Sequence, residues 1–234
     1  MKLLRASQIF SQGGIAAWPI CLGYMPIGLA FGVLAQKAGL SPLQVALMSI
    51  FVFAGSSQFI AVSMLSAGAS FAAIVATTFM VNLRHMLMSS SLAAILGRQN
   101  RWKLSLFAYG VTDESFAVNY TRLSAGNWGL DRSLVVNHSA NLIWLVSTVA
   151  GVYFGHLIPA HALGIDYALT AMFICLLIFQ LKDRIAILTA IIAGLLAVVL
   201  SLFIPGNAYI VLASMLAAGV GVVIKRQLFS GERI

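Results

Sequence analysis

Charged residues are scarce in this sequence. Only 9% of the 234 residues are charged, against about a quarter in a typical soluble domain. With 61% hydrophobic residues and a mean hydropathy of +0.98, the composition excludes an ordinary soluble protein and indicates a polytopic membrane protein. Apolar stretches recur from residue 15 to residue 224, so we expect a single transmembrane domain over residues 1–234.

Several chemical signatures are also lacking. The two cysteines, Cys21 and Cys175, lie in apolar runs without CxxC or Cys/His spacing, so we interpret them as packing residues and expect no metal site. No GxxxxGK[ST] phosphate loop occurs, which argues against ATP hydrolysis, and no GxSxG nucleophile motif occurs. The first residues lack a long apolar region with a cleavage signal, so we expect no removable signal peptide. We therefore predict no enzyme and no cofactor.

The hydrophobic runs predict an all-α fold. A crossing helix needs about 20 predominantly apolar residues, and short loops rich in turn-forming and charged residues separate the runs. Seven or eight of the segments are expected to cross the membrane, and some are expected to be broken or re-entrant. The predicted segments are 15–36, 43–66, 68–96, 104–121, 134–157, 163–181, 185–204 and 207–224.

Lysine and arginine give the chain a formal net charge of +8. They lie mainly in short loops and at the termini, which is typical of topogenic charges rather than of nucleic-acid binding. Placing basic loops in the cytoplasm gives a consistent C-terminal half, but the basic loop 98–103 falls outside if every segment crosses. Either the charge bias is overridden or one segment enters and returns on the same side. The polar-interrupted segments 43–66 and 104–121 are the candidates for such a return.

Glycine and proline are concentrated in the stretch GYMPIGLAFG at 23–32. Pro26 removes a backbone donor, and Gly23 and Gly28 leave the backbone unshielded, so the sequence predicts a bent or opened helix at these three residues. The alternative is a packing face, because Gly28 and Gly32 have the spacing of a GxxxG interface.

The second segment is interrupted by Gly55, Ser56, Ser57 and Gln58. An unwound turn here would expose backbone N–H groups and hydroxyls at the start of a half-helix, where an anion such as a carboxylate is attracted. We interpret these four residues as a candidate substrate-binding cradle. Small residues that allow close helix packing are the alternative.

Ionisable residues occur inside two other segments. A charge at the bilayer centre costs at least ~2.5–3.5 kcal/mol, so such residues face a protein interior or a water-filled path. Arg84 requires an acceptor, and Asp113 or Glu114 is its natural counter-ion. His85 titrates near neutral pH and is a candidate for a proton relay with these groups. The alternatives are an interfacial position for the basic pair and a purely structural ion pair between two helices.

Amide side chains mark a further segment. Asn137 and Asn141 have i, i+4 spacing and share a helix face with His138. They are candidates for hydrogen bonds to a polar substrate. Amide and histidine side chains in membranes more often join helices to one another, and we favour that interpretation.

Four stretches, GYMPIGLAFGVLA, FAGSSQF, NLRHMLMSSSL and GVTDESFA, occur in this order along the chain. Together they closely resemble the AzlC family of branched-chain amino acid permeases, most strongly over 20–118 and weakly beyond residue 160. The RH pair followed by the DE pair is the most specific part of the resemblance. Met88 and Ser89 stand where relatives carry Tyr-Gly, which leaves the substrate preference open.

The resemblance implies a secondary transporter that works with a small AzlD-like membrane subunit. It would export valine, leucine or isoleucine, with methionine as a further candidate, across the bacterial inner membrane, and proton coupling is the favoured driving force. The substrate carboxylate would bind the backbone from Gly55 to Ser57, and the ammonium group would bind Asp113 or Glu114. The residues expected to shape the apolar pocket are Met25, Phe31, Phe53 and Phe59.

Two other functional classes stay open from the residues alone. An ion or metal channel would use the intramembrane acidic and histidine residues. A membrane-embedded enzyme would use the clustered hydroxyls, but nucleophilic catalysis needs a base within hydrogen-bonding reach, which a sequence does not reveal. Competition of uptake by leucine or by cations would separate a carrier from a channel.

Overall fold

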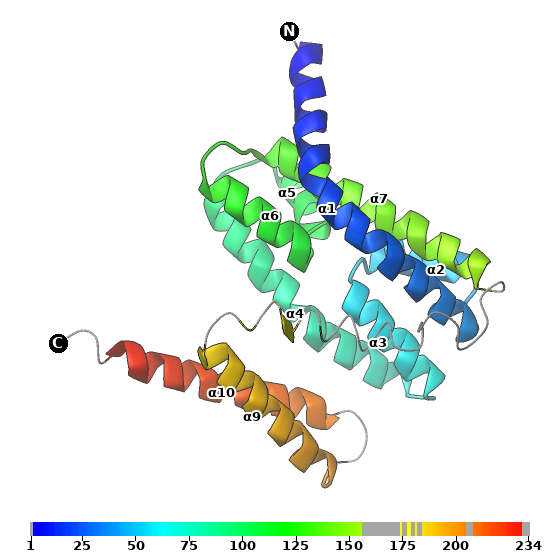
Figure 1. The fold of residues 1–234 in the computed structure, drawn as a ribbon, viewed down its shortest axis with the longest axis vertical. Helices are drawn as coiled ribbons and strands as arrows, with labels where there is room; N and C mark the ends of the chain where they lie inside the picture. The colour runs from blue at the N-terminus through cyan, green and yellow to red at the C-terminus, as the bar shows by residue number, and fades with distance from the viewer. Residues whose placement is uncertain are drawn as a thin grey trace. The chain divides into compact units, whose positions relative to one another are not determined.

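The fold is built from helices (Figure 1). The computed structural model describes residues 2–155, 174, 177–178, 181, 184–204 and 208–230. Every regular element in this part of the chain is an α-helix, which confirms the predicted all-α class. The helices are α1 (Lys2–Lys37), α2 (Pro42–Phe51), α3 (Gly55–Ser66), α4 (Phe71–Leu96), α5 (Arg101–Tyr109), α6 (Asp113–Ser124), α7 (Leu130–Phe154), α9 (Arg184–Ser201) and α10 (Ala208–Ser230).

Four described helices are long and apolar enough to cross a membrane, namely α1 over Ala6–Lys37, α4, α7 and α9. The part of the chain that the structure describes is therefore all-helical and has four candidate membrane spans. The predicted count of seven or eight crossings is not confirmed. Segments 43–66 and 104–121 each consist of two short helices, and segment 163–181 lies almost entirely outside the described residues.

The chain divides into two compact units, which we describe separately. The first comprises Met1–Ser70 and Val81–Leu169, and the second comprises Phe71–Met80 and Thr170–Ile234. In the second unit α9 packs along α10, where a Cβ on Gly221 would lie 2.6 Å from Thr189 Oγ1. All predicted polar site residues belong to the first unit. The expectation of a single domain stays a prediction.

The parallel helices α1 and α7 form the framework of the first unit (Figure 1). A Cβ on Gly32 would lie 2.8 Å from Gly151 Cα, so glycine at this position permits the close approach. The order of the contacts makes the two helices parallel. From one end to the other, Gly13 meets Val135, Gly28 meets Ser147, and Gly32 meets Gly151.

Gly28 and Gly32 of α1 serve helix packing. α1 continues as one α-helix through Gly23, Pro26 and Gly28, so the structure does not show an opened helix at these residues. A Cβ on Gly28 would collide with Ser147, which places Gly28 with Gly32 on the packing face that the sequence offered as the alternative. Packed neighbours allow a membrane helix to tolerate an internal proline such as Pro26.

The pair α2–α3 enters the first unit from the end of α7 and returns toward that end. Ser41 and Pro42, where α2 begins, line a hollow of about 370 Å³ together with Val152 and Tyr153 of α7. Deeper in, Ser49 contacts Thr148. The chain reverses near the middle of α7. Phe59 of α3 then packs on Phe31, which lies closer than Tyr24 to the C-terminal end of α1. The helices have 10 and 12 residues, about half the ~20 needed to cross.

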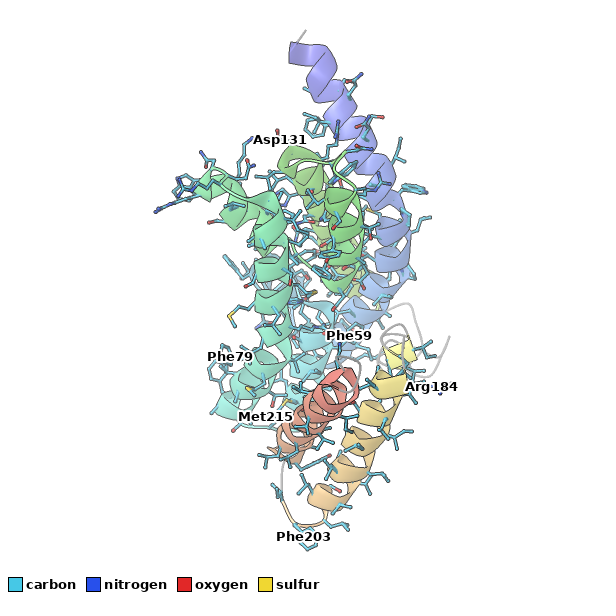
Figure 2. The ribbon with its side chains drawn as sticks, turned by 90° about the vertical axis from the view of Figure 1, so that its left-hand side faces the viewer. Phe59, Phe79, Asp131, Arg184, Phe203 and Met215 are labelled. Atoms are coloured by element: carbon cyan, nitrogen blue, oxygen red, sulfur yellow. The ribbon has the colours of Figure 1, made fainter. Side chains whose placement is uncertain are left out.

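The pair α5–α6 enters the first unit from the opposite end, where α7 begins, and returns toward that end. Lys103 at the start of α5 forms an ion pair with Asp131 at the start of α7, and Figure 2 shows Asp131 at that end of the unit. Leu104 of α5 and Leu123 of α6 both pack with Leu130 in one cluster. With 9 and 12 residues, neither helix is long enough to cross. Segments 43–66 and 104–121 thus each enter and return at the same end of the first unit, and we expect both to be re-entrant in the membrane.

α4 crosses in the direction opposite to α1 and α7. Its residue Leu92 packs with Leu130 at the start of α7. Arg84, two turns earlier, instead contacts Ser56 of α3, the helix that lies against the middle of α7. α4 is therefore antiparallel to α7.

This topology resolves the conflict in the charge pattern. The face where α1 begins also holds loop 97–100, the starts of α5 and α7, and the end of α6. Basic residues are concentrated on that face, so by the positive-inside rule we expect it to be the cytoplasmic face. The basic residues concerned are Lys2, Arg5, Arg98, Arg101, Lys103, Arg122 and Arg132.

Single cysteines introduced into the loops test this topology. In a Cys21→Ala/Cys175→Ala background, Gln99→Cys and Asn127→Cys are expected to react with an impermeant maleimide only from the cytoplasmic side. Ala38→Cys and Ala69→Cys are expected to react only from the other side. Labelling of right-side-out and inverted vesicles measures this.

Crossing by both polar-interrupted segments would give a different pattern. Positions 38 and 99 would then label from outside, and positions 69 and 127 from inside. That result would contradict the re-entrant assignment.

Candidate functional site

The start of α3 is the first part of the site. Three non-helical residues, 52–54, separate α2 from α3, and Phe53 among them has a positive φ of 39°. Ala54 precedes the helix and provides no side-chain cap. The first N–H groups of an α-helix have no intrahelical acceptor, so this start offers backbone donors. A Cβ on Gly55 would lie 3.1 Å from Trp144 Cη2, which shows how closely α3 approaches α7.

The start of α6 is the second part, and it carries a capping box. Thr112 Oγ1 accepts from Ser115 N at 3.3 Å, and Ser115 Oγ accepts from Thr112 N at 2.9 Å. Asp113 and Glu114 occupy the first turn, where the helix dipole favours negative charge. The spacing Thr-x-x-Ser is a sequence signal for this helix start that our sequence interpretation did not use.

Arg84 of α4 joins the two helix starts. Its Nη2 atom lies 3.1 Å from Asp113 Oδ2 and donates to Ser56 Oγ at 2.5 Å. The Arg84 and Asp113 side chains keep 29% and 30% of their surface exposed, and Arg84 Nε is buried without a hydrogen-bond partner. The sequence-predicted Arg84, Ser56 and Asp113 therefore meet at one point.

Tyr24 of α1 completes this cluster, and the sequence interpretation missed it. Its hydroxyl lies 2.7 Å from Glu114 Oε2 and 2.8 Å from Thr112 Oγ1. An ionised carboxylate only accepts, so Tyr24 donates to Glu114 in that state. Tyr24 is buried against Trp144, with ring centroids 5.4 Å apart. A tyrosine beside Pro26 in the glycine-rich stretch was the available signal.

The tips of the two re-entrant pairs also touch directly. Tyr109 at the end of α5 donates to the Ile50 carbonyl near the end of α2, at 2.5 Å. The Phe53 and Tyr109 rings lie 6.1 Å apart. Ser57 donates to Asn82 of α4, which ties the start of α3 to the same helix as Arg84. The two pairs are therefore in direct contact beside Arg84.

Gln58, predicted to bind substrate, is instead part of a buried network between α2, α3 and α7. Its Nε2 donates to Ser49 Oγ at 3.3 Å, and its Oε1 accepts from Trp144 Nε1 at 2.9 Å. Ser49 also shares a 2.9 Å hydrogen bond with Thr148. Gln58 is fully buried, so this geometry favours the packing alternative for this residue.

Replacing Gln58 with alanine is expected to lower the free energy of unfolding by about 2 kcal/mol or more, because Trp144 Nε1 loses its acceptor and a cavity forms. Thermal unfolding in detergent measures the effect. Gln99→Ala is the matched control, since Gln99 is exposed and bonds only the Leu96 carbonyl. Equal melting temperatures for the two variants would contradict the assigned role.

Asn137 likewise joins helices. Its Nδ2 donates to the Phe107 carbonyl at 2.9 Å, and its Oδ1 accepts from Asn119 Nδ2 at 2.8 Å. Both ends of the amide are therefore occupied by α5 and α6. Asn141 is more exposed and donates to Tyr109 Oη at 3.3 Å, next to the contact between the two pairs.

The remaining predicted residues are placed as follows. Among the described residues, no hydrogen bond or ion pair links His85 to Asp113 or Glu114. Phe31 and Phe59 are buried against each other with ring centroids 5.1 Å apart. Met25 is exposed. No group of three His, Cys, Asp or Glu side chains able to hold a metal ion occurs in the described part of the chain, and Cys175 lies outside it.

Comparisons with known proteins agree on the family. The AzlC protein model matches residues 19–158. The Inner membrane protein YgaZ of Escherichia coli (strain K12) is 32% identical over 83% of this chain and 83% of its own length. The Branched-chain amino acid transport protein AzlC of Bacillus subtilis (strain 168) is 31% identical over 92% of this chain and 84% of its own length. No solved structure gives a significant match. The chain belongs to the AzlC protein family.

Proposed function

We propose that this protein is a secondary transporter that exports branched-chain amino acids across the inner membrane of a bacterium. The Bacillus subtilis relative is named as a branched-chain amino acid transport protein, and the Escherichia coli relative as an inner membrane protein. The observation that carries the proposal is the position of Arg84, whose Nη2 contacts both Ser56 and Asp113 where two re-entrant pairs meet.

The site offers complementary charges for a zwitterion. The carboxylate of the amino acid binds Arg84 together with the Ser56 and Ser57 hydroxyls and the uncapped N–H groups from Gly55 onward, since guanidinium groups bind carboxylates strongly. The ammonium group binds Asp113, which the substrate carboxylate releases from Arg84, with Glu114 adjacent. Opening one ion pair therefore provides both partners that the amino acid requires.

The two re-entrant pairs provide a route for alternating access. α2–α3 faces the non-cytoplasmic side, and α5–α6 faces the cytoplasm. Moving α5–α6 away breaks the Tyr109 to Ile50 hydrogen bond and exposes Arg84 to the cytoplasm. Moving α2–α3 away breaks the same contact and exposes Arg84 to the other side. Broken helices that meet near the midplane are a recurring arrangement in secondary transporters.

The proposal also includes the driving ion, a partner subunit and a further substrate. Protons drive export, with the acidic pair and His85 as the titratable groups near Arg84. A small AzlD-like membrane subunit works with this chain. Methionine is an additional substrate because its unbranched side chain adapts to apolar pockets.

Counterflow of radiolabelled amino acids in proteoliposomes tests this function, with and without the co-expressed small subunit. Vesicles preloaded with leucine are expected to accumulate labelled valine, leucine and isoleucine, while aspartate and lysine fail to exchange. A lack of counterflow in both preparations would contradict the proposal. Inhibition by divalent cations but not by unlabelled leucine would indicate ion transport instead.

A further inference from the structure

The two adjacent carboxylates at the start of α6 have different partners. Asp113 forms an ion pair with Arg84 at 3.1 Å. Glu114 contacts no cation among the described residues, and its Oε2 atom accepts from the neutral Tyr24 hydroxyl at 2.7 Å. The two groups have the same chemistry and lie in the same helical turn, so this difference in partners separates their roles.

An unpaired carboxylate halfway across a membrane is costly unless it can become neutral. Glu114 accepts from Tyr24, whose ring packs on Trp144 in the middle part of α7. The partner of Glu114 is a hydroxyl, which can donate to a carboxylate or accept from a carboxylic acid. Asp113 instead lies 3.1 Å from Arg84, a permanent cation.

We propose that Glu114 is the proton-binding group of the transporter, whereas Asp113 serves as the fixed counter-ion of Arg84. The inference rests on the proposed function and deepens it. A proton from water on the non-cytoplasmic side binds the Glu114 carboxylate and is released as a hydrated proton on the cytoplasmic side. The zwitterionic amino acid moves in the opposite direction, so each cycle moves one net positive charge inward and no bond other than O–H forms or breaks.

The surroundings of Glu114 support this division. Tyr24 of α1 and Thr112 provide neutral hydroxyls on one side. From α4, Arg84 is engaged by Asp113 and Ser56, and His85 is the next residue of the same helix. In the neutral state Glu114 carries an O–H donor, which Tyr24 Oη can accept from, so the contact survives protonation with its direction reversed.

The experiment compares two fluxes in proteoliposomes containing the full chain and its small subunit. Leucine counterflow reports exchange, and a trapped pH-sensitive dye reports leucine-driven proton movement. Glu114→Gln is expected to reduce proton movement at least twentyfold while exchange stays within about tenfold of the parent. Glu114→Asp is expected to restore proton movement with a displaced pH midpoint. Asp113→Asn is expected to reduce both fluxes together.

Tyr24→Phe provides an independent readout. Loss of a donor to the ionised carboxylate is expected to move the pH midpoint of net transport upward with little change at saturating proton concentration. The assignment would be overturned if proton movement survived Glu114→Gln or if both fluxes fell equally in that variant. An unchanged pH midpoint in both Glu114→Asp and Tyr24→Phe would also overturn it. Absence of leucine counterflow in the parent protein would instead reject the proposed function.

Discussion

Replacing Arg84 with alanine is expected to reduce leucine transport at least 100-fold. Arg84 Nη2 contacts Ser56 and Asp113, so its removal takes away the proposed carboxylate partner and leaves Asp113 without its cation. Removing one partner of a buried ion pair costs about 3–5 kcal/mol, and partial exposure of this pair reduces that penalty. Counterflow together with thermal unfolding separates the two effects.

Two further variants make this result interpretable. Arg84→Ala/Asp113→Ala removes both charges and is expected to recover thermal stability but not transport. Lys103→Ala removes the more exposed ion pair with Asp131 and is expected to leave stability and transport close to the parent values, because exposed ion pairs contribute little. Transport by the double variant would contradict a substrate-binding role for Arg84 and favour a structural ion pair.

Replacing Gly32 with leucine is expected to prevent α1 from packing on α7. A Cβ alone would lie 2.8 Å from Gly151 Cα, so a larger side chain must force the two backbones apart. Overpacking of this kind costs about 3 kcal/mol, and the framework of the first unit depends on this contact. The expected result is a large loss of monodisperse protein in gel filtration, with a markedly lower melting temperature for any protein that remains.

Gly23→Leu on the same helix is the matched control. A Cβ on Gly23 would meet no atom within 4 Å, and leucine has a higher helix propensity than glycine. The control variant is therefore expected to equal or exceed the parent in stability. Loss of folding in Gly23→Leu would instead support the helix break that the sequence predicted and that continuous α1 does not show.

The sequence was sufficient to identify the polar site residues that a lipid environment should exclude. Arg84, Ser56 and Asp113 were singled out because charges and hydroxyls inside apolar runs need partners, and the structure places them together. Tyr24 was missed because a tyrosine next to a glycine-rich stretch has no periodic signal. Gln58 was assigned to substrate because composition does not reveal that buried neighbours already satisfy both ends of its amide. For Asn137 the favoured interpretation was helix joining, and α5 and α6 occupy both ends of its amide.

Topology was less accessible from the sequence. Hydropathy does not distinguish a crossing from a pair of short helices with a few polar residues between them, so 43–66 and 104–121 were ambiguous. The structure gives both the same order: a short helix, a break, a 12-residue helix, a turn and a long helix. Gly68 and Gly126 occupy the matching turns with positive φ of 72° and 79°. Because the pairs enter from opposite ends, the arrangement is an inverted repeat, which leaves little trace in sequence.

The central claim is that the starts of α3 and α6 meet at Arg84 within one site that accepts an amino acid. Cross-linking of Ser56→Cys to Asp113→Cys with a short bifunctional thiol reagent, in a background without Cys21 and Cys175, tests it most directly. Rapid cross-linking is the expected result, because Arg84 Nη2 contacts both Ser56 and Asp113. The absence of a cross-link would contradict the claim.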